Sequence, residues 1–439
     1  MAVLPANRVW RRLFLAQIVA LSGTGLATVA LGLLAWDLAG PQAGTVLGTA
    51  LAIKMVAYVG VAPVAAAFAE RLPRRRLLVG LDLVRAAMAA CLPFVTEIWQ
   101  VYLLIFLLQS ASAAFTPTVQ ALIPDILTDE AAYTRALSAS RLAYDLEAVA
   151  SPALAAALLS VTGFHALFGG TALGFLVSAG LIAGLALPAF RAAGPRPPLG
   201  RRSLDGLHII LATPRLRALA AIDLALAAAG AMVIVNTVVI VQGRLGLNES
   251  RTALLLAING AGSMLAALTL PRLLDRLPER RVMLTGTALL APCLLAGLTT
   301  PTPLTLAALW FTLGLASAYA QTPAGRLLRR SAAPEDRPAL FAAQFAVSHA
   351  CWLLAYPLAG WGGAVLGTDA AFAMMAVIAG IAATAAMLFW HSHDPAVVEH
   401  VHAALPEGHP HLADARPGPR GHVHAHAFVI DRHHRHWPR

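Results

Sequence analysis

The sequence contains little charge and almost no lysine. Asp, Glu, Lys and Arg together make up 12 % of its 439 residues, and Lys54 is the single lysine among 32 basic residues. Soluble proteins of this size carry about twice that charged fraction. Because 58 % of the residues are hydrophobic, the composition excludes a soluble protein and predicts an all-α integral membrane protein.

Cysteine and the common catalytic motifs are also scarce. The three cysteines Cys91, Cys293 and Cys351 lie far apart inside apolar segments, so the sequence offers neither a disulfide framework nor a CxxC site. No glycine-rich phosphate-binding loop appears, which argues against direct use of ATP. No nucleophile–base pattern points to an enzyme, and we expect no tightly bound cofactor. The arginines lie in alternate loops, which argues against a nucleic-acid partner.

Apolar stretches of about 20 residues alternate with short arginine- or turn-rich breaks along most of the chain. The strongest break separates six predicted spans from six more. We therefore predict an N-terminal six-helix bundle in residues 1–190, a cytoplasmic linker in 191–216, a second six-helix bundle in 217–390 and a tail in 391–439. The twelve predicted transmembrane spans are 13–36, 45–69, 77–96, 99–121, 137–160, 165–188, 217–242, 252–271, 282–299, 303–325, 339–364 and 368–390.

The distribution of arginine predicts the orientation, because loops rich in Lys and Arg stay in the cytoplasm. Loops on one side of the predicted bundle contain only Arg244 and Arg251. The other side carries the N-terminal arginines and those after spans two, eight and ten: Arg8, Arg11, Arg12, Arg71, Arg74, Arg75, Arg76, Arg272, Arg276, Arg280, Arg281, Arg326, Arg329, Arg330 and Arg337. We expect both termini in the cytoplasm of a bacterium, and the chain as a monomer in the lipid bilayer of its inner membrane.

The two predicted bundles repeat each other. The segment ERLPRRR, residues 70–76, returns as DRLPERR at 275–281, an offset of 205 residues. At the same offset, Lys54 corresponds to Asn259 and Pro152 to Pro357. Such repeats are typical of transporters that bind their substrate near the midplane, between the two halves.

The repeated loops resemble the signature of the major facilitator superfamily. Its acidic and basic positions are occupied by Glu70, Arg71, Arg74 and Arg75, and again by Asp275, Arg276, Arg280 and Arg281. Substitutions loosen the match at its glycines and at one basic position: Ala66, Pro271, Pro73, Pro278 and Glu279. The resemblance implies twelve helices in two bundles and a motif that latches helix ends as the transporter switches state. Asp82 and Arg85, one turn apart in span three, resemble a structural pair of bacterial exporters in the superfamily.

The last 49 residues hold twelve of the fifteen histidines. These histidines come in close sets: His391, His393, His400, His402, His409, His411, His422, His424, His426, His433, His434 and His436. Imidazole binds Ni²⁺, Co²⁺, Zn²⁺ and Cu²⁺, so the pattern predicts metal binding over a merely solvated basic tail. Interspersed prolines and glycines predict that the tail is flexible rather than packed.

The twelve-span body with a histidine-rich tail resembles the nickel-resistance exporters of the superfamily. That resemblance implies export of Ni²⁺, with Co²⁺ as the second candidate ion, in exchange for protons. Two alternatives stay open: a drug or siderophore exporter of the same fold, and a membrane-tethered metal buffer or sensor.

Few polar residues within the spans are candidates for transport or coupling. Glu147 lies on a polar stripe of span five without an evident local partner, which is expensive in a membrane and usually functional. Asp145 has Arg141 four residues earlier and is read first as one half of an ion pair. Lys54 could pair with Glu147 or with Asp37 across the cavity.

The sequence gives weaker reasons to assign the other polar residues of the spans to transport. His349 could supply one metal ligand, but Cys351 points to nearly the opposite face of the same helix, so the two cannot chelate one ion. Asp223 could be an interfacial charge. Asn259 matches Lys54 in the repeat and is expected to face the cavity.

Overall fold

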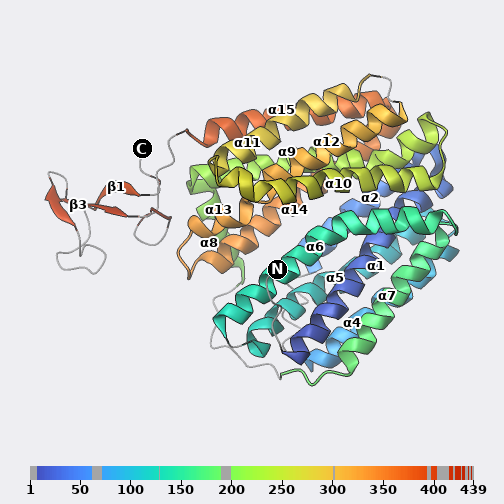
Figure 1. Cartoon of the computed structure of the whole chain (residues 1–439), viewed down its shortest axis with the longest axis horizontal. Helices are drawn as coiled ribbons and strands as arrows, with labels where there is room; N and C mark the ends of the chain where they lie inside the picture. Colours follow the sequence, from blue (N-terminus) through green and yellow to red (C-terminus); the bar gives the residue numbers. More distant parts are fainter. Residues whose placement is uncertain are drawn as a thin grey trace.

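The computed structural model is a helical bundle with a small sheet at the C-terminal end of the chain (Figure 1). It describes residues 7–61, 72–127, 129–188, 199–299, 302–392, 397–402, 415–418, 421–426, 428–430, 434 and 437. The N-terminal half consists of α1 (Arg8–Ala39), α2 (Ala43–Val56) with a π-helical turn (Ala57–Val61), α4 (Arg74–Cys91), α5 (Ile98–Ile126), α6 (Glu130–Leu159) and α7 (His165–Ala183). The C-terminal half consists of α8 (Leu199–Ala212), α9 (Pro214–Val238) with a π-helical turn (Val239–Arg244), α10 (Glu249–Leu274), α11 (Glu279–Ala296), α12 (Pro303–Gln321), α13 (Ala324–Arg330), α14 (Arg337–Leu366) and α15 (Thr368–Phe389).

Each of the twelve predicted spans coincides with one of the long helices, so the predicted fold class is confirmed. Nine helical segments of the described chain are long and apolar enough to cross a membrane, and one of them, Arg8–Val61, contains two predicted spans. Two short helices, α8 and α13, were not anticipated, because their arginines and flanking prolines were read as loop. Helix α8 packs closely on α14: a Cβ on Gly206 would lie 2.2 Å from the carbonyl oxygen of Ala339.

The two halves touch tightly at one end of the bundle. Helices α2 and α14 cross at glycines, and a Cβ on Gly360 would lie 2.1 Å from the carbonyl oxygen of Gly44. Trp361 Nε1 donates to Thr49 Oγ1 at 3.0 Å, and Ser250 Oγ donates to the carbonyl of Leu159 at 3.1 Å. The opposite end, at which α4, α9, α11 and α14 begin, is called here the arginine-rich end.

A buried ion pair holds the N-terminal half together. Asp82 is fully buried in α4 and pairs with Arg85 one turn later, while Ser178 Oγ of α7 donates to Asp82 Oδ2 at 2.7 Å. The Arg85 guanidinium carbon lies 4.0 Å from the ring centroid of Phe115 and 4.5 Å from that of Phe175. The pair therefore joins α4, α5 and α7, as a structural role requires.

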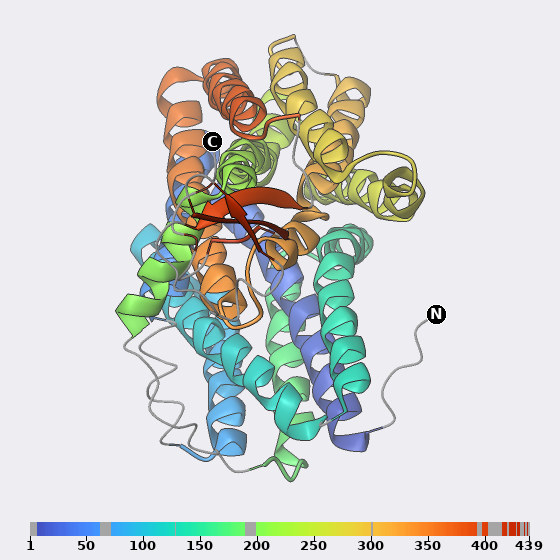
Figure 2. The ribbon, with the colours of Figure 1, turned by 90° about the vertical axis from the view of Figure 1, so that its left-hand side faces the viewer.

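The tail contains a three-stranded antiparallel sheet, where the sequence had predicted no packed structure. Its order is β1-β3-β2, formed by β1 (Val398–His402), β2 (Arg416–Gly418) and β3 (Gly421–His426). His400 lies opposite His424 and His402 opposite His422. The alternation of His with Val and Ala in β3 has the period of a strand, a signal that the prolines and glycines obscured. Figures 1 and 2 show the sheet beyond the arginine-rich end of the C-terminal half.

Candidate functional site

A cavity of about 540 Å³ lies between the two halves. Its lining residues come from α1, α2, α5 and α6 on one side and from α12 and α14 on the other. Most of them lie in the half of their helix that is nearer the arginine-rich end, whereas Tyr356 lies at the glycine crossing that closes the far end. The cavity therefore faces the arginine-rich end. Lining side chains include Gln17, Lys54, Tyr58, Phe115, Thr116, Gln120, Ser140, Gln321, Phe345, Ser348, His349, Trp352 and Tyr356.

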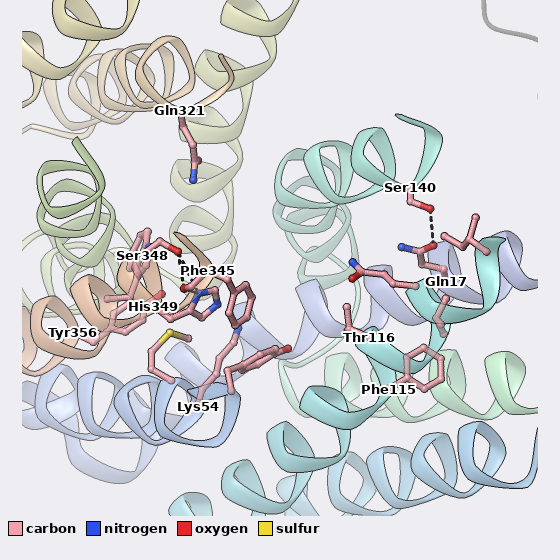
Figure 3. A pocket seen from close by; sticks show the side chains of 16 residues that line it. Gln17, Lys54, Phe115, Thr116, Ser140, Gln321, Phe345, Ser348, His349 and Tyr356 are labelled. Atoms are coloured by element: carbon pink, nitrogen blue, oxygen red, sulfur yellow. Dashed lines mark hydrogen bonds between the residues drawn. The ribbon is translucent and has the colours of Figure 1, made fainter. Parts of the chain in front are cut away.

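The polar groups form two clusters on opposite walls (Figure 3). On one wall Lys54 extends toward His349 and Phe345. On the other wall Ser140 Oγ donates to Gln17 Oε1 at 3.2 Å. Among the described lining residues, Lys54 supplies the one formal charge and no carboxylate is present. The cavity itself is thus an amide-, hydroxyl- and aromatic-lined space with a cationic wall.

Glu147 supplies the counter-charge from behind this lining. The Lys54 ammonium lies within electrostatic range of the Glu147 carboxylate, but no direct ion pair joins these two described side chains, so the proposed pairing stays a prediction. Glu147 packs against α1 where that helix has a glycine, because a Cβ on Gly25 would lie 2.4 Å from Glu147 Oε1. Asp37, the other partner considered for Lys54, lies exposed at the end of α1 near Glu249.

His349 has a defined tautomer when it is neutral. Its Nδ1 lies 2.8 Å from the carbonyl oxygen of Phe345, and its ring stacks on the Phe345 ring with centroids 3.7 Å apart. A carbonyl only accepts, so Nδ1 carries the hydrogen and Nε2 keeps the lone pair. Cys351 does not line the cavity.

The other candidates from the spans lie elsewhere. Asp223 is buried in α9 and accepts a hydrogen bond from Gln344 Nε2 at 2.5 Å, outside the cavity lining. Asn259 Nδ2 donates to the carbonyl of Trp310 at 2.8 Å and so joins α10 to α12. Asn259 is not among the residues that line this cavity, and its amide hydrogen bonds to the neighbouring helix. Asp145 lies in α6, and its side chain is outside the described residues.

The described part of the repeated arginine motif forms ion pairs in both halves. Arg74 at the start of α4 pairs with Asp125 at the end of α5. In the second half, Glu279 at the start of α11 lies 3.3 Å from Arg330 of α13. Arg280 Nε donates to the carbonyl of Trp390 at 2.7 Å. The remaining described members, Arg75, Asp275, Arg276 and Arg281, are exposed, and Glu70 and Arg71 lie outside the described residues.

Sequence reasoning missed these pairs, although the repeat contained the signal. Asp125 and Arg330 are separated by 205 residues, and so are Arg74 and Glu279. Glu279 had been read only as a departure from the motif. Its partner shows that the second half retains the latch with its charges exchanged.

Four histidines of the tail come together. His400, His424, His426 and His434 each place a ring nitrogen so that all four nitrogens lie within 4.8 Å of one another. His391 is exposed, and His422 lies in β3 outside this cluster. His402 lies in β1, with its side chain not described. The other tail histidines lie outside the described residues: His393, His409, His411, His433 and His436.

Comparisons with known proteins agree with the fold. The sequence profile described as Major Facilitator Superfamily matches residues 13–248 and 221–425. A crystal structure of a bacterial homolog of the human lysosomal transporter Spinster, in an inward-facing unoccupied conformation, is similar with a TM-score of 0.70 and 14 % identity, over 87 % of this chain and 96 % of that one. The nucleoside transporter NupG is similar with a TM-score of 0.66 and 14 % identity, over 87 % of this chain and 99 % of that one.

Curated relatives match over shorter stretches. Macrolide efflux protein A of Streptococcus pyogenes is 25 % identical over 176 residues, which is 37 % of this chain and 43 % of the relative. Macrolide efflux protein A of Enterococcus faecalis is 26 % identical over 142 residues, 30 % of this chain and 44 % of the relative. The matched stretch thus spans less than half the length of these relatives.

Proposed function

The chain belongs to the major facilitator superfamily, and we propose that it is a proton-coupled exporter of divalent metal ions, Ni²⁺ in the first place and Co²⁺ in the second. In this proposal it lies in the inner membrane of a bacterium with the arginine-rich end in the cytoplasm, as the arginine distribution favours. The cavity then faces the cytoplasm, from which an exporter loads its substrate.

The histidine cluster of the tail is the observation that carries the metal assignment. Four imidazole nitrogens within 4.8 Å of one another offer a complete donor set for a borderline metal ion. The cluster stands at the arginine-rich end, the same end toward which the cavity faces. A metal-binding arm at the entrance raises the local metal concentration there.

Lys54, Glu147 and His349 are the groups proposed to couple metal to proton movement. While the Lys54 ammonium points into the cavity, it repels a divalent cation there. The Glu147 carboxylate attracts the ammonium electrostatically. Protonation of Glu147 weakens that attraction, whereas loss of the proton restores a negative charge behind the cavity wall. His349 Nε2 offers a neutral nitrogen ligand for a transient metal contact. A site with few ligands suits a carrier, since it must release its ion.

A second candidate function is export of an organic, drug-like compound. It is favoured by the lining, in which aromatic rings and amides dominate and the one formal charge is positive. The relatives named macrolide efflux protein point the same way. In this case the tail is a separate metal-responsive element.

Everted membrane vesicles with a pH-sensitive dye inside separate these functions. We expect uptake of ⁶³Ni²⁺ driven by an inside-acid gradient and release of lumenal protons on addition of Ni²⁺. A panel of Co²⁺, Zn²⁺ and Cu²⁺ ranks the metals, and a radiolabelled macrolide serves as the organic arm. Macrolide uptake without ⁶³Ni²⁺ uptake would establish the second function. Metal binding without any transport would support the third alternative, a membrane-tethered metal buffer.

A further inference from the structure

The geometry around His400 points to a metal site rather than to a hydrogen-bonded histidine cluster. His400 Nδ1 lies 3.0 Å from the carbonyl oxygen of Val398, so in the neutral ring Nδ1 donates and Nε2 keeps the lone pair. Two further nitrogens approach this one lone pair: His424 Nε2 at 3.1 Å and His434 Nε2 at 2.9 Å. The lone pair of His400 Nε2 can accept a hydrogen bond from one N–H donor, but two nitrogens approach it. A cation at the centre of the cluster could instead be bound by the lone pairs of all four nitrogens.

Two of the nitrogen separations are close to those around a tetrahedral ion. With metal–nitrogen bonds of about 2.0–2.1 Å, neighbouring nitrogens of a tetrahedral site lie about 3.3 Å apart. The observed Nε2 separations of 2.9 and 3.1 Å are close to that value. The carbonyl of Val398 orients His400 in the way that a backbone oxygen commonly orients a ligating histidine.

The cluster is continuous with a contact between the tail and the transporter body. The Phe428 ring lies 4.9 Å from that of His400 and 4.6 Å from that of His434, by ring centroids. Phe428 is buried, and its carbonyl accepts from Arg215 Nη2 of α9 at 3.5 Å. The Arg215 guanidinium carbon lies 4.8 Å from the Trp437 ring centroid.

Arg215 is itself fixed on the body. It is buried at the start of α9, and its Nε donates to Ser331 Oγ at 2.8 Å, directly after α13. Phe428 therefore contacts both the histidine cluster and Arg215 at the arginine-rich end of the C-terminal half, and with Trp437 it marks the two ends of segment 428–437. His434 belongs both to the cluster and to this segment.

We propose that His400, His424, His426 and His434 bind one Ni²⁺, Co²⁺ or Zn²⁺ ion, and that filling this site docks segment 428–437 on Arg215. The ion joins strands β1 and β3 to the end of the chain, so the tail is a metal-dependent latch on the C-terminal half. Of the other histidines that the structure describes, His391 and His422 lie outside the four-nitrogen cluster. The inference deepens the proposed function, since it assigns a response to cytosolic metal at the loading end of the same transporter.

Metal binding is tested first, on the full-length protein in detergent with Ni²⁺, Co²⁺ and Zn²⁺. We expect one tight site per chain, which His434→Ala or His400→Ala weakens at least tenfold. His422→Ala is the matched control, because His422 lies on the same strand but outside the cluster. Bound Co²⁺ should give the intense visible absorption of a tetrahedral site. Equal tight binding in His434→Ala and wild type would overturn the site.

Docking is tested by hydrogen exchange of the amides in residues 428–437. We expect metal to slow their exchange in wild type and in His422→Ala, but not in His434→Ala. Trp437→Ala keeps all four ligands, so it should bind metal normally and lose most of the metal-dependent protection. Protection that does not depend on metal would overturn the latch. Failure of ⁶³Ni²⁺ transport with intact metal-dependent docking would reject the proposed export and leave this inference standing.

Discussion

The two six-helix halves have side chains at equivalent positions of the repeat, but the residues at those positions differ in charge and polarity. The latch Arg74–Asp125 of the N-terminal half returns 205 residues later as Glu279–Arg330, with the charges exchanged. Gly25 accommodates Glu147 in the first half, and in the second the equivalent Gly230 accommodates Trp352, since a Cβ there would lie 2.3 Å from the Trp352 ring.

This comparison separates geometry from function. The glycine in α1 or α9 makes room for a large side chain of α6 or α14, and either a carboxylate or an indole fills that room. In the first half Glu147 acts electrostatically on Lys54, whereas the counterpart of Lys54 in the second half, Asn259, donates to a backbone carbonyl. The charge that we assign to coupling is therefore confined to one half, while helix packing is shared by both.

Replacing the acid should have the largest effect. Glu147→Gln leaves Lys54 without its counter-charge, so we expect proton movement driven by metal to fall at least about tenfold, because unpaired charges within a membrane are costly. Proton flux is followed with the pH dye in vesicles. Trp352→Phe, at the equivalent position of the other half, alters the cavity lining without removing a charge and should retain more of the flux than Glu147→Gln. Near-normal flux in Glu147→Gln would remove Glu147 from the mechanism.

The buried ion pair Asp82–Arg85 tests whether the N-terminal half stays stable with the uncharged residues that the C-terminal half has at the equivalent positions. The equivalent positions in the C-terminal half are Thr287 and Leu290, both buried. Asp82→Thr alone should cost about 3–5 kcal/mol of stability, because it leaves the Arg85 charge buried without its carboxylate. The double variant Asp82→Thr/Arg85→Leu should recover much of that loss. Thermal unfolding in detergent measures both, and a double variant less stable than the single one would contradict the comparison.

The ion pairs Arg74–Asp125 and Glu279–Arg330 should tolerate an exchange of their two charges but not two like charges side by side. Arg74→Glu places a carboxylate beside Asp125, and we expect a several-fold loss of transport. Arg74→Glu with Asp125→Arg reproduces the polarity of Glu279–Arg330 and should restore most of it. Arg75→Glu, at an exposed neighbour, is the control. Transport rates in vesicles decide the result, and a double variant no better than Arg74→Glu would show that the two latches are not equivalent.

Removal of the tail should have the smallest effect. Truncation after Trp390 keeps the carbonyl that accepts from Arg280 and the whole helical body. Because the tail adds local concentration rather than a transport route, we expect nickel tolerance of cells to fall only a few-fold, with the protein still in the membrane. Unchanged tolerance would make the tail dispensable, and complete loss would place it in the transport path.

Most of the fold could be predicted from the sequence, because hydropathy reports each span directly. The twelve spans and the six-plus-six division needed only apolar length and the arginine-rich breaks. Helices α8 and α13 escaped this reading, since a short amphipathic helix with arginines looks like a loop until its partner is known. The tail sheet escaped it because pairing of β1 with β3 joins residues far apart in sequence.

The candidate site was predicted only in part. The sequence could name Lys54, Glu147 and His349 as costly polar groups in apolar surroundings, yet it could not rank their partners. From its repeat position the sequence predicts that Asn259 faces the cavity, whereas in the structure the Asn259 amide donates a hydrogen bond to a backbone carbonyl of α12. It also gave no weight to Asp125, which becomes a partner only when α5 ends beside the start of α4.

By itself the sequence determined a duplicated, membrane-spanning helical body with an imidazole-rich end, because composition and periodicity are local properties of the chain. The tertiary structure alone decided that Glu147 lies within electrostatic range of Lys54, that the ion pairs Arg74–Asp125 and Glu279–Arg330 exchange their charges between the halves, and that four described histidines of the tail bring their ring nitrogens together. These outcomes depend on which helix faces and strands are brought within a few ångströms of each other, and no one-dimensional pattern specifies that proximity.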